Sequence, residues 1–116
     1  MDAAVSFHES TVVDLRQHRN AVELVLTDVS SEGCKFDAVI SIVGVRSIVS
    51  DDKETHDLRM HYPDGEVLRL DLSPTQLDLL IEWNDFAGRR SLVRQYRITG
   101  EQTSLSFPRR FRSDDN

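Results

Sequence analysis

The sequence predicts an all-β protein: a single-domain antiparallel β-sandwich or partly open barrel of about eight short strands. Three observations predict this fold. Apolar and polar residues alternate with a period of two through most of the chain. Turn sequences rich in Gly, Pro, Asn and Ser separate these segments at short, regular intervals. The 116 residues allow one domain, which we place at 1–107, with 108–116 as a flexible C-terminal tail.

The first two strands are predicted on either side of the loop Gln17–Asn20. Val13 and Leu15 form the apolar face before the loop, and Val22 and Leu24 form the apolar face after it. Matching the two faces across four loop residues pairs Leu15 with Val22 and Val13 with Leu24.

The longest extended segment is predicted at 34–49. Its alternation changes parity near Gly44, which predicts a bulge or bend there. The charged sequence 51–54 that follows lacks the ligand spacing and the central glycine of a calcium loop. We therefore expect a solvated loop at this position.

The segment 58–72 is predicted to be a β-hairpin whose turn is Pro63–Gly65. Proline fixes φ at the second position of a turn, and glycine can take the positive φ that such a turn requires. With a three-residue loop, the apolar faces match when Met60 lies opposite Leu68.

The segment 74–87 allows two structures. Ser73–Gln76 has the form of a capping box with proline at the first helical position, which would give an α+β protein with one helix at about 74–87. Seven of the eight residues 77–84 alternate as in a strand, and we favour the strand. Strands at 91–99 and 103–107 complete the prediction.

The composition excludes several classes of protein. Fourteen basic and 20 acidic residues give a net charge of −6, which disfavours nucleic acid and anionic lipid as partners. The single cysteine, Cys34, excludes an internal disulfide and is expected to be buried. No apolar segment approaches the roughly 20 residues that span a membrane. The first residues lack a signal-peptide pattern, so we expect a cytoplasmic protein, and twelve Arg against two Lys suit a bacterial genome.

The charges are unevenly distributed along the chain. Residues 1–88 carry 7 basic and 17 acidic side chains, whereas residues 89–116 carry 7 basic and 3 acidic ones. Compensation between neighbouring strands is the simpler explanation. The alternative is that the basic sequence Phe107–Arg112 contacts phosphate or an acidic protein.

The chain contains no catalytic signature. Walker, dinucleotide-binding, Gly-X-Ser-X-Gly and His-Glu-X-X-His motifs are all absent from the sequence. The histidines His8, His18, His56 and His61 are scattered, without the spacing of metal ligands. We therefore predict no catalytic residues, no metal and no cofactor.

One cluster of residues is a candidate binding site. Strand parity buries Trp83, and Asn84 and Asp85 then begin a turn. In the structural interpretation, Trp83 anchors the core while Asn84 and Asp85 cap the turn. In the functional interpretation, this turn and His8–Glu9 lie at one end of the sheet and form a polar rim for a basic partner.

The sequence Phe7-His8-Glu9-Ser10, followed by strand, turn and strand, resembles the opening Phe-His-Asp-Ser of several small, mostly uncharacterised bacterial β-protein families. Some of these are grouped with the immunity proteins of polymorphic toxin systems. Ile81–Phe86 and Tyr96–Ile98 resemble the second half of the same pattern. Glu9 stands where those families have Asp, which keeps a carboxylate but changes its reach. The resemblance implies a small β-domain that binds another protein, with no catalytic residues to carry over.

Two classes of function remain open. The sequence favours a non-enzymatic domain that binds another protein, immunity-like or accessory and regulatory, whose acidic surface suits a basic partner. The alternative is a small ligand-binding or enzymatic β-barrel with a site assembled from distant strands. A flat acidic patch with an exposed aromatic residue would support the first class. A pocket lined by several of His8, His61, Asp57 and Trp83 would support the second. Free sheet edges also predict a homodimer.

Overall fold

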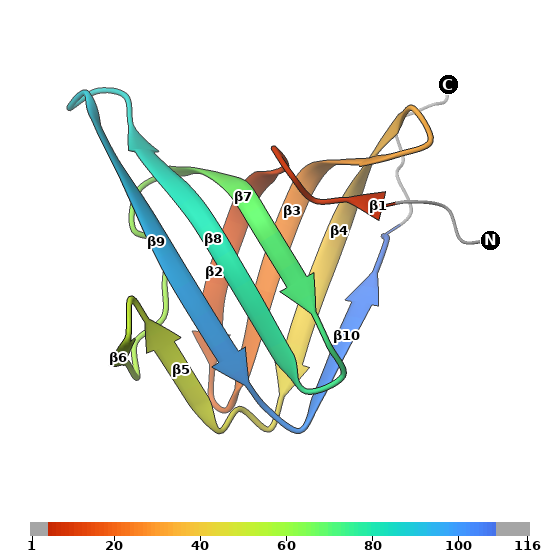
Figure 1. Ribbon diagram of the computed structural model, residues 1–116, viewed down its shortest axis with the longest axis vertical. Coiled ribbons are helices and arrows are strands. Elements are labelled where there is room, and N and C mark those ends of the chain that lie inside the picture. Colours follow the sequence, from red (N-terminus) through yellow and green to blue (C-terminus); the bar gives the residue numbers. More distant parts are fainter. Residues whose placement is uncertain (1–4, 109–116) are drawn as a thin grey trace.

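The computed structural model describes residues 5–108, which form ten β-strands and no helix (Figure 1). The strands are β1 (Val5–Ser6), β2 (Thr11–His18), β3 (Ala21–Ser31), β4 (Cys34–Val43), β5 (Ser47–Ser50), β6 (Lys53–Glu54), β7 (Asp64–Leu72), β8 (Gln76–Asp85), β9 (Arg90–Thr99) and β10 (Gln102–Ser106). All pairs are antiparallel, in the order β10-β4-β3-β2-β7-β8-β9-β5-β6, with β1 beside β3. The all-β prediction is confirmed, and β8 occupies the segment for which a helix was the alternative.

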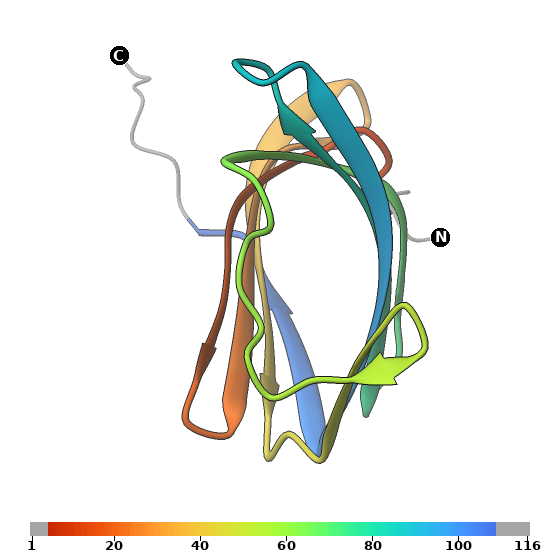
Figure 2. The same ribbon diagram turned by 90° about the vertical axis from the view of Figure 1, so that its left-hand side faces the viewer.

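The single sheet folds over into two facing layers without closing (Figure 2). One layer holds β2, β3, β4 and β10, and the other holds β7, β8, β9 and β5. β2 joins them, because it pairs with β3 along its length but with β7 only at Thr11 and Val12. Where the two strands separate, the segment 55–63 crosses from β6 to β2, and Arg59 bridges to Arg16.

β-Bulges interrupt the pairing of three strands of the sheet. The register shifts in β2 between Val12 and Asp14, and similar shifts occur in β3 and β7. A bulge adds one residue to a strand, so it bends the strand and reverses which side chains point inward. Val12 is buried as a result, and Val13 is 52% exposed.

The predicted register of the first hairpin is wrong because the loop has two residues and not four, and the bulge separately removes Val13 from the apolar face. Leu15 lies opposite Leu24, and Val13 occupies the bulge. The pairing continues to His18 and Ala21, which leaves this two-residue turn. Alternation reports parity within one strand, and it contains no signal for the residue that a bulge inserts.

The predicted hairpin at 58–72 is also wrong. The segment before Asp64 contributes only one bridge to the sheet, and Met60 does not lie opposite Leu68. β7 instead pairs with β8 along its whole length, with Leu72 opposite Leu77. The apolar faces of β7 and β8 match over this long ladder, which outweighs the local turn signal.

Gly65 lies inside β7, where its missing side chain serves packing rather than a turn. A Cβ atom at this position would lie 2.6 Å from Cζ3 of Trp83 and 3.2 Å from Cγ2 of Ile81. Only glycine therefore lets the indole ring fill the space beneath β7.

Two smaller predictions are refined by the structure. The long segment 34–49 is divided at Gly44, which has a φ of +62° and separates β4 from β5. In the charged sequence 51–54, Asp51 and Asp52 form a tight turn in the left-handed region, and Lys53–Glu54 form the two-residue strand β6. Residues 109–116 of the predicted tail lie outside the described residues.

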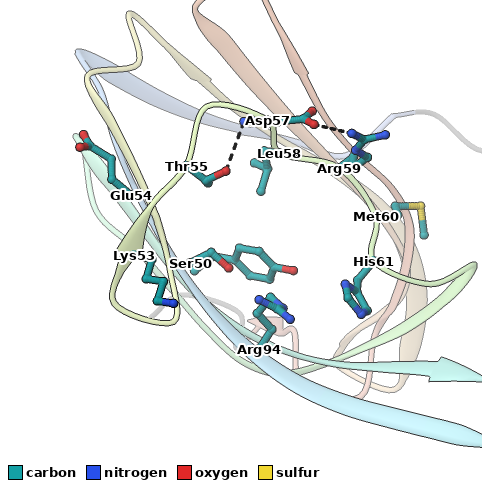
Figure 3. Close-up of a pocket in the computed structure, with 11 residues that line it drawn as sticks. Ser50, Lys53, Glu54, Thr55, Asp57, Leu58, Arg59, Met60, His61 and Arg94 are labelled. Carbon is teal, nitrogen blue, oxygen red and sulfur yellow. Dashed lines mark hydrogen bonds and ion pairs between the residues drawn. The ribbon is translucent and has the colours of Figure 1, made fainter.

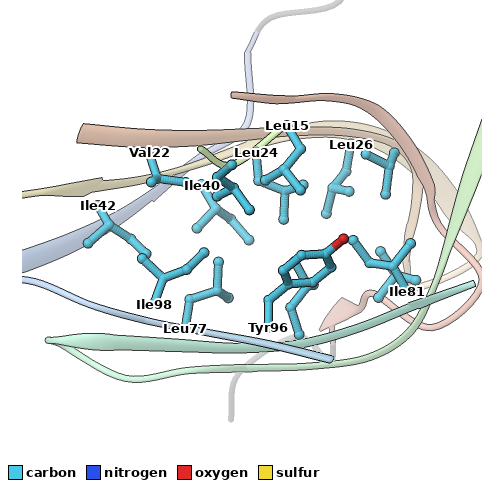
Figure 4. Close-up of a cluster of buried hydrophobic side chains, with 14 of the residues drawn as sticks. Leu15, Val22, Leu24, Leu26, Ile40, Ile42, Leu77, Ile81, Tyr96 and Ile98 are labelled. Carbon is cyan, nitrogen blue, oxygen red and sulfur yellow. The ribbon is translucent and has the colours of Figure 1, made fainter. Parts of the chain in front are cut away.

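The hydrophobic core lies between the two layers. Figure 4 shows aliphatic side chains of β2, β3 and β4 meeting those of β8 and β9. Trp83 is the largest fully buried side chain, and its Nε1–H donates a 2.8 Å hydrogen bond to the hydroxyl of Tyr96. Burying each large aliphatic side chain contributes about 1.5–3 kcal/mol, so this interior dominates the stability of the sheet.

Candidate functional site

The outer surface of β7 and β8 carries two glutamates directly opposite each other. Val67 on β7 and Ile81 and Trp83 on β8 are fully buried. Glu66 directly precedes Val67, and Glu82 lies between Ile81 and Trp83, so both glutamates point outward. The register pairs these two glutamates across the strands. Like charges in this position destabilise a sheet. Within residues 5–108, no lysine or arginine forms an ion pair with either carboxylate.

The neighbouring positions extend this surface. Asp64 lies opposite Asn84, whose Nδ2 donates a 3.5 Å hydrogen bond to the aspartate. On β9, Val93 lies opposite Glu82 and is 48% exposed. We call the group formed by Asp64, Glu66, Glu82 and Val93 the acidic end of the β7–β9 surface.

The turn between β8 and β9 projects beyond the acidic end. Phe86, in this turn, is 74% exposed, the highest value among the large apolar side chains of the described residues. Asp85 accepts a 3.1 Å hydrogen bond from the N–H of Gly88 and lies 3.6 Å from Arg90. Arg90 is thus held by Asp85. An exposed aromatic ring therefore lies in the turn that follows the strand of Glu82, four positions beyond this residue.

The same three strands carry a second pair of opposed acids with different surroundings. Asp71 lies opposite Asp78, but Arg97 donates a 2.8 Å hydrogen bond to Asp78 and Arg69 lies 3.9 Å from Asp71. We call these four residues the paired end. Burial opposes ionisation of Asp78, yet the hydrogen bonds from Arg97 and Gln76 prevail, and the pKa of Asp78 is lowered.

His8 and Glu9 lie beside β7, next to the acidic end. The N–H of Glu9 donates to the carbonyl of Val67 at 2.7 Å, and Nδ1 of His8 donates to the carbonyl of Leu68 at 3.0 Å. The carbonyl of the fully buried Ser10 accepts from the N–H of Val67 at 2.8 Å. The Phe7–Ser10 sequence thus docks the start of β2 onto the bulge of β7.

The predicted site residues lie on either side of β7 but do not form one rim. His8 and Glu9 contact the middle of β7, whereas Asn84 and Asp85 adjoin its first residues. Trp83 is fully buried and its only donor is used by Tyr96, so it acts as a core residue here. Asp85 caps its turn as the structural interpretation describes.

Sequence reasoning missed Glu66 and Glu82 as a pair. They are sixteen positions apart in the chain, and only the register of β7 on β8 joins them. It also missed Phe86, although that residue ends the Ile81–Phe86 sequence singled out in the chain. Exposure of a turn aromatic is not visible in the alternation pattern.

A pocket of about 540 Å³ lies away from this surface, at the opening between the layers (Figure 3). Its lining includes His61 and Asp57 but neither His8 nor Trp83. It also includes Arg94, which sequence reasoning missed. The signal was present, because Arg94 occupies an inward position of the alternating series that runs from Leu92 to Ile98.

Tyr96 is one of the residues that line this pocket and is almost fully buried. Burial raises the pKa of its hydroxyl, and the hydrogen bond from Trp83 and the charge of Arg94 offset only part of that effect. Tyr96 is therefore neutral and remains a hydrogen-bonding group.

Other chemical features of the described residues are limited. No group of three or more His, Cys, Asp or Glu side chains among them is arranged to hold a metal ion. Nor do these residues include a helix long and apolar enough to cross a membrane. Cys34 is exposed at the start of β4, which corrects the prediction that it is buried. Cys34 directly follows the turn between β3 and β4, in which Gly33 has a φ of +80°.

Comparison with known proteins identifies no family. No protein-family model and no curated protein matches the chain. Among solved structures, the chain is similar to an uncharacterised protein from Neisseria gonorrhoeae, with 16% sequence identity and a TM-score of 0.43. The match covers 91% of this chain and 98% of that one. A likeness at this level carries no information about function.

Proposed function

We propose that the protein is a non-enzymatic binding domain that recognises a basic protein through the acidic end and Phe86. The observation that carries the proposal is the opposed pair Glu66 and Glu82, which forms no ion pair with a cation of the described chain. An immunity-like or regulatory role, as the sequence resemblance implies, would use the same surface.

Electrostatics supports a basic partner. Two carboxylates facing each other across neighbouring strands repel, and a partner's lysine or arginine would relieve that repulsion on binding. The net charge of −6 adds a long-range field that speeds the approach of a basic protein. Binding should therefore weaken as salt screens the charges.

Phe86 supplies the apolar contact that such an interface needs. Aromatic residues often carry a large share of binding energy when a partner covers them. Phe86 is 74% exposed, and Val93 beside the glutamates is 48% exposed. The two apolar side chains and the glutamates give one surface a hydrophobic and a charged component.

The test is a comparison of Glu66→Gln/Glu82→Gln with wild type in capturing a partner from the native host. The partner is identified by mass spectrometry with wild type, produced separately and titrated against each variant. Glu32→Gln/Glu101→Gln is the matched control, because it removes two exposed carboxylates from turns on other parts of the molecule. We expect the first double variant to bind about tenfold or more weakly, and the control to bind like wild type.

The glutamine variant separates binding from folding. Removal of two repelling charges should not destabilise the sheet, so weaker binding cannot be attributed to unfolding. Phe86→Ala should also weaken binding, since the ring is exposed in the free protein. If Glu66→Gln/Glu82→Gln and Phe86→Ala both bind the partner as wild type does, the proposal is wrong.

A further inference from the structure

The pocket between the layers contains an arginine that points toward the interior of the molecule. Arg94 on β9 lies opposite Ile81, which is fully buried, so its side chain enters on the core side of the sheet. β9 continues inward with the buried Tyr96 and Ile98. A cation in an apolar inward series indicates a role other than packing.

The guanidinium group of Arg94 is only partly satisfied. Its Nη1 lies 3.5 Å from a carboxylate oxygen of Asp51. Its Nε is buried and has no hydrogen-bond partner within residues 5–108. Native proteins pair almost all buried polar groups, so the hydrogen-bonding capacity of this guanidinium group is not fully used within the described residues.

A second cation, Lys53, and the imidazole ring of His61 also line the pocket beside Arg94. Figure 3 shows Lys53 and His61 on either side of it, while Glu54 extends away from the cavity. Within the described chain, Lys53 forms no ion pair. Asp57, the other carboxylate of the lining, is paired with Arg59. Because Arg94 is paired with Asp51 and Arg59 with Asp57, Lys53 remains as one positive charge in the lining without an ion pair, in a protein whose net charge is −6.

Apolar and hydroxyl groups complete the lining. Leu58 and Tyr96, which are 5% and 3% exposed, give the cavity an apolar wall, and Ser50 adds a hydroxyl. The volume of about 540 Å³ lies in the range of small-molecule sites, which combine apolar walls with a few polar groups. Such a lining fits a molecule with a charged head and an apolar body.

We infer that this pocket binds a small organic anion, a carboxylate or phosphate monoester on an apolar body, with Arg94 as its principal contact. The planar guanidinium group carries five N–H donors, more than its contact with Asp51 uses, and can bind the oxygens of such a head group from within the pocket. Lys53 adds a mobile positive charge at the rim. The inference does not depend on the acidic end, because Glu66 and Glu82 point to the outside of the sheet.

The experiment follows amide and arginine Nε–H resonances by NMR while benzoate, phenyl phosphate, inorganic phosphate or neutral benzyl alcohol is added. We expect saturable shifts of the Arg94 Nε–H and of residues 50–61 with benzoate or phenyl phosphate. The one of these two that binds more tightly identifies the head group. Benzyl alcohol should bind at least about tenfold more weakly, because it lacks the charge that the guanidinium group recognises.

Two variants and a control make the test specific. Arg94→Gln should weaken binding of the preferred anion at least about tenfold, and Lys53→Gln, an exposed position that the fold does not need, should weaken it severalfold. Arg46→Gln removes one exposed arginine elsewhere and should have no effect. The inference is overturned if no anion gives saturable shifts, if inorganic phosphate binds as tightly as the organic anions, or if neither pocket variant weakens binding.

Discussion

The acidic end and the paired end lie on the same three strands and have the same opposed acids, yet only one of them is neutralised. Glu66 faces Glu82 at the acidic end, and Asp71 faces Asp78 at the paired end. Arg97 reaches Asp78 at 2.8 Å, whereas no arginine within the described residues reaches either glutamate. Sheet stability explains the residues of the paired end but not those of the acidic end. Surface residues that do not stabilise the fold are candidates for a role in binding.

The largest expected effect separates the core beneath the acidic end from its surface. Trp83→Ala should lower the free energy of unfolding by about 3–5 kcal/mol, because it empties the largest buried site and leaves the hydroxyl of Tyr96 unpaired. Phe86→Ala, three residues later, should change it by no more than about 0.5 kcal/mol. Urea unfolding measures both. A small effect for Trp83→Ala would show that the indole does not hold the core together.

A second prediction concerns Gly65, which lies between two acids of the acidic end. Gly65→Ala should cost about 1–3 kcal/mol, because the new methyl group would overlap the indole ring of Trp83. Cζ3 belongs to the second fused ring of the indole, which phenylalanine does not have. The loss in the free energy of unfolding for Gly65→Ala/Trp83→Phe should therefore be smaller than the sum for the two single changes. Strictly additive costs in urea unfolding would contradict the proposed contact.

The sequence predicted the structural role of Trp83 correctly but not that of Gly65. Parity over Leu77–Trp83 was enough to identify β8 as a strand and Trp83 as buried, although Ser73–Gln76 looked like the start of a helix. The role of Gly65 was misread as a turn, because its true neighbour, Trp83, lies eighteen residues away. Local signals of turns do not report which distant strand will pair.

The sequence predicted part of the candidate site but not its pair of opposed glutamates. Asn84 and Asp85 were identified from their turn chemistry, and they do adjoin the acidic end. Glu66 and Glu82 could not be matched, since a predicted hairpin at 58–72 placed β7 against the wrong partner. The bulge in β7 between Val67 and Arg69, which also shifts register, is invisible in the alternation.

A third, smaller effect tests the paired end through pH. The pKa of Asp78 is lowered in the folded protein, so its charged form stabilises the fold above the ordinary aspartate pKa of about 3.9. That contribution should be lost as the pH falls from about 4 through the lowered pKa. Asp78→Asn should therefore flatten the decline in stability between about pH 4 and pH 2, as measured by urea unfolding at each pH. An unchanged decline would mean that the Arg97 contact does not stabilise Asp78.

The smallest expected effect has the opposite sign and addresses the acidic end directly. In Glu66→Gln/Glu82→Gln, two facing carboxylates become amides that can form a hydrogen bond across the strands, so the free energy of unfolding should rise by about 0.2–1 kcal/mol. The gain should shrink as salt screens the repulsion in wild type. Glu32→Gln/Glu101→Gln, with the same change in net charge, separates this local effect from a general reduction of negative charge. A loss of stability in the first variant would mean that the glutamates support the sheet, and the reason to assign them to a partner would then disappear.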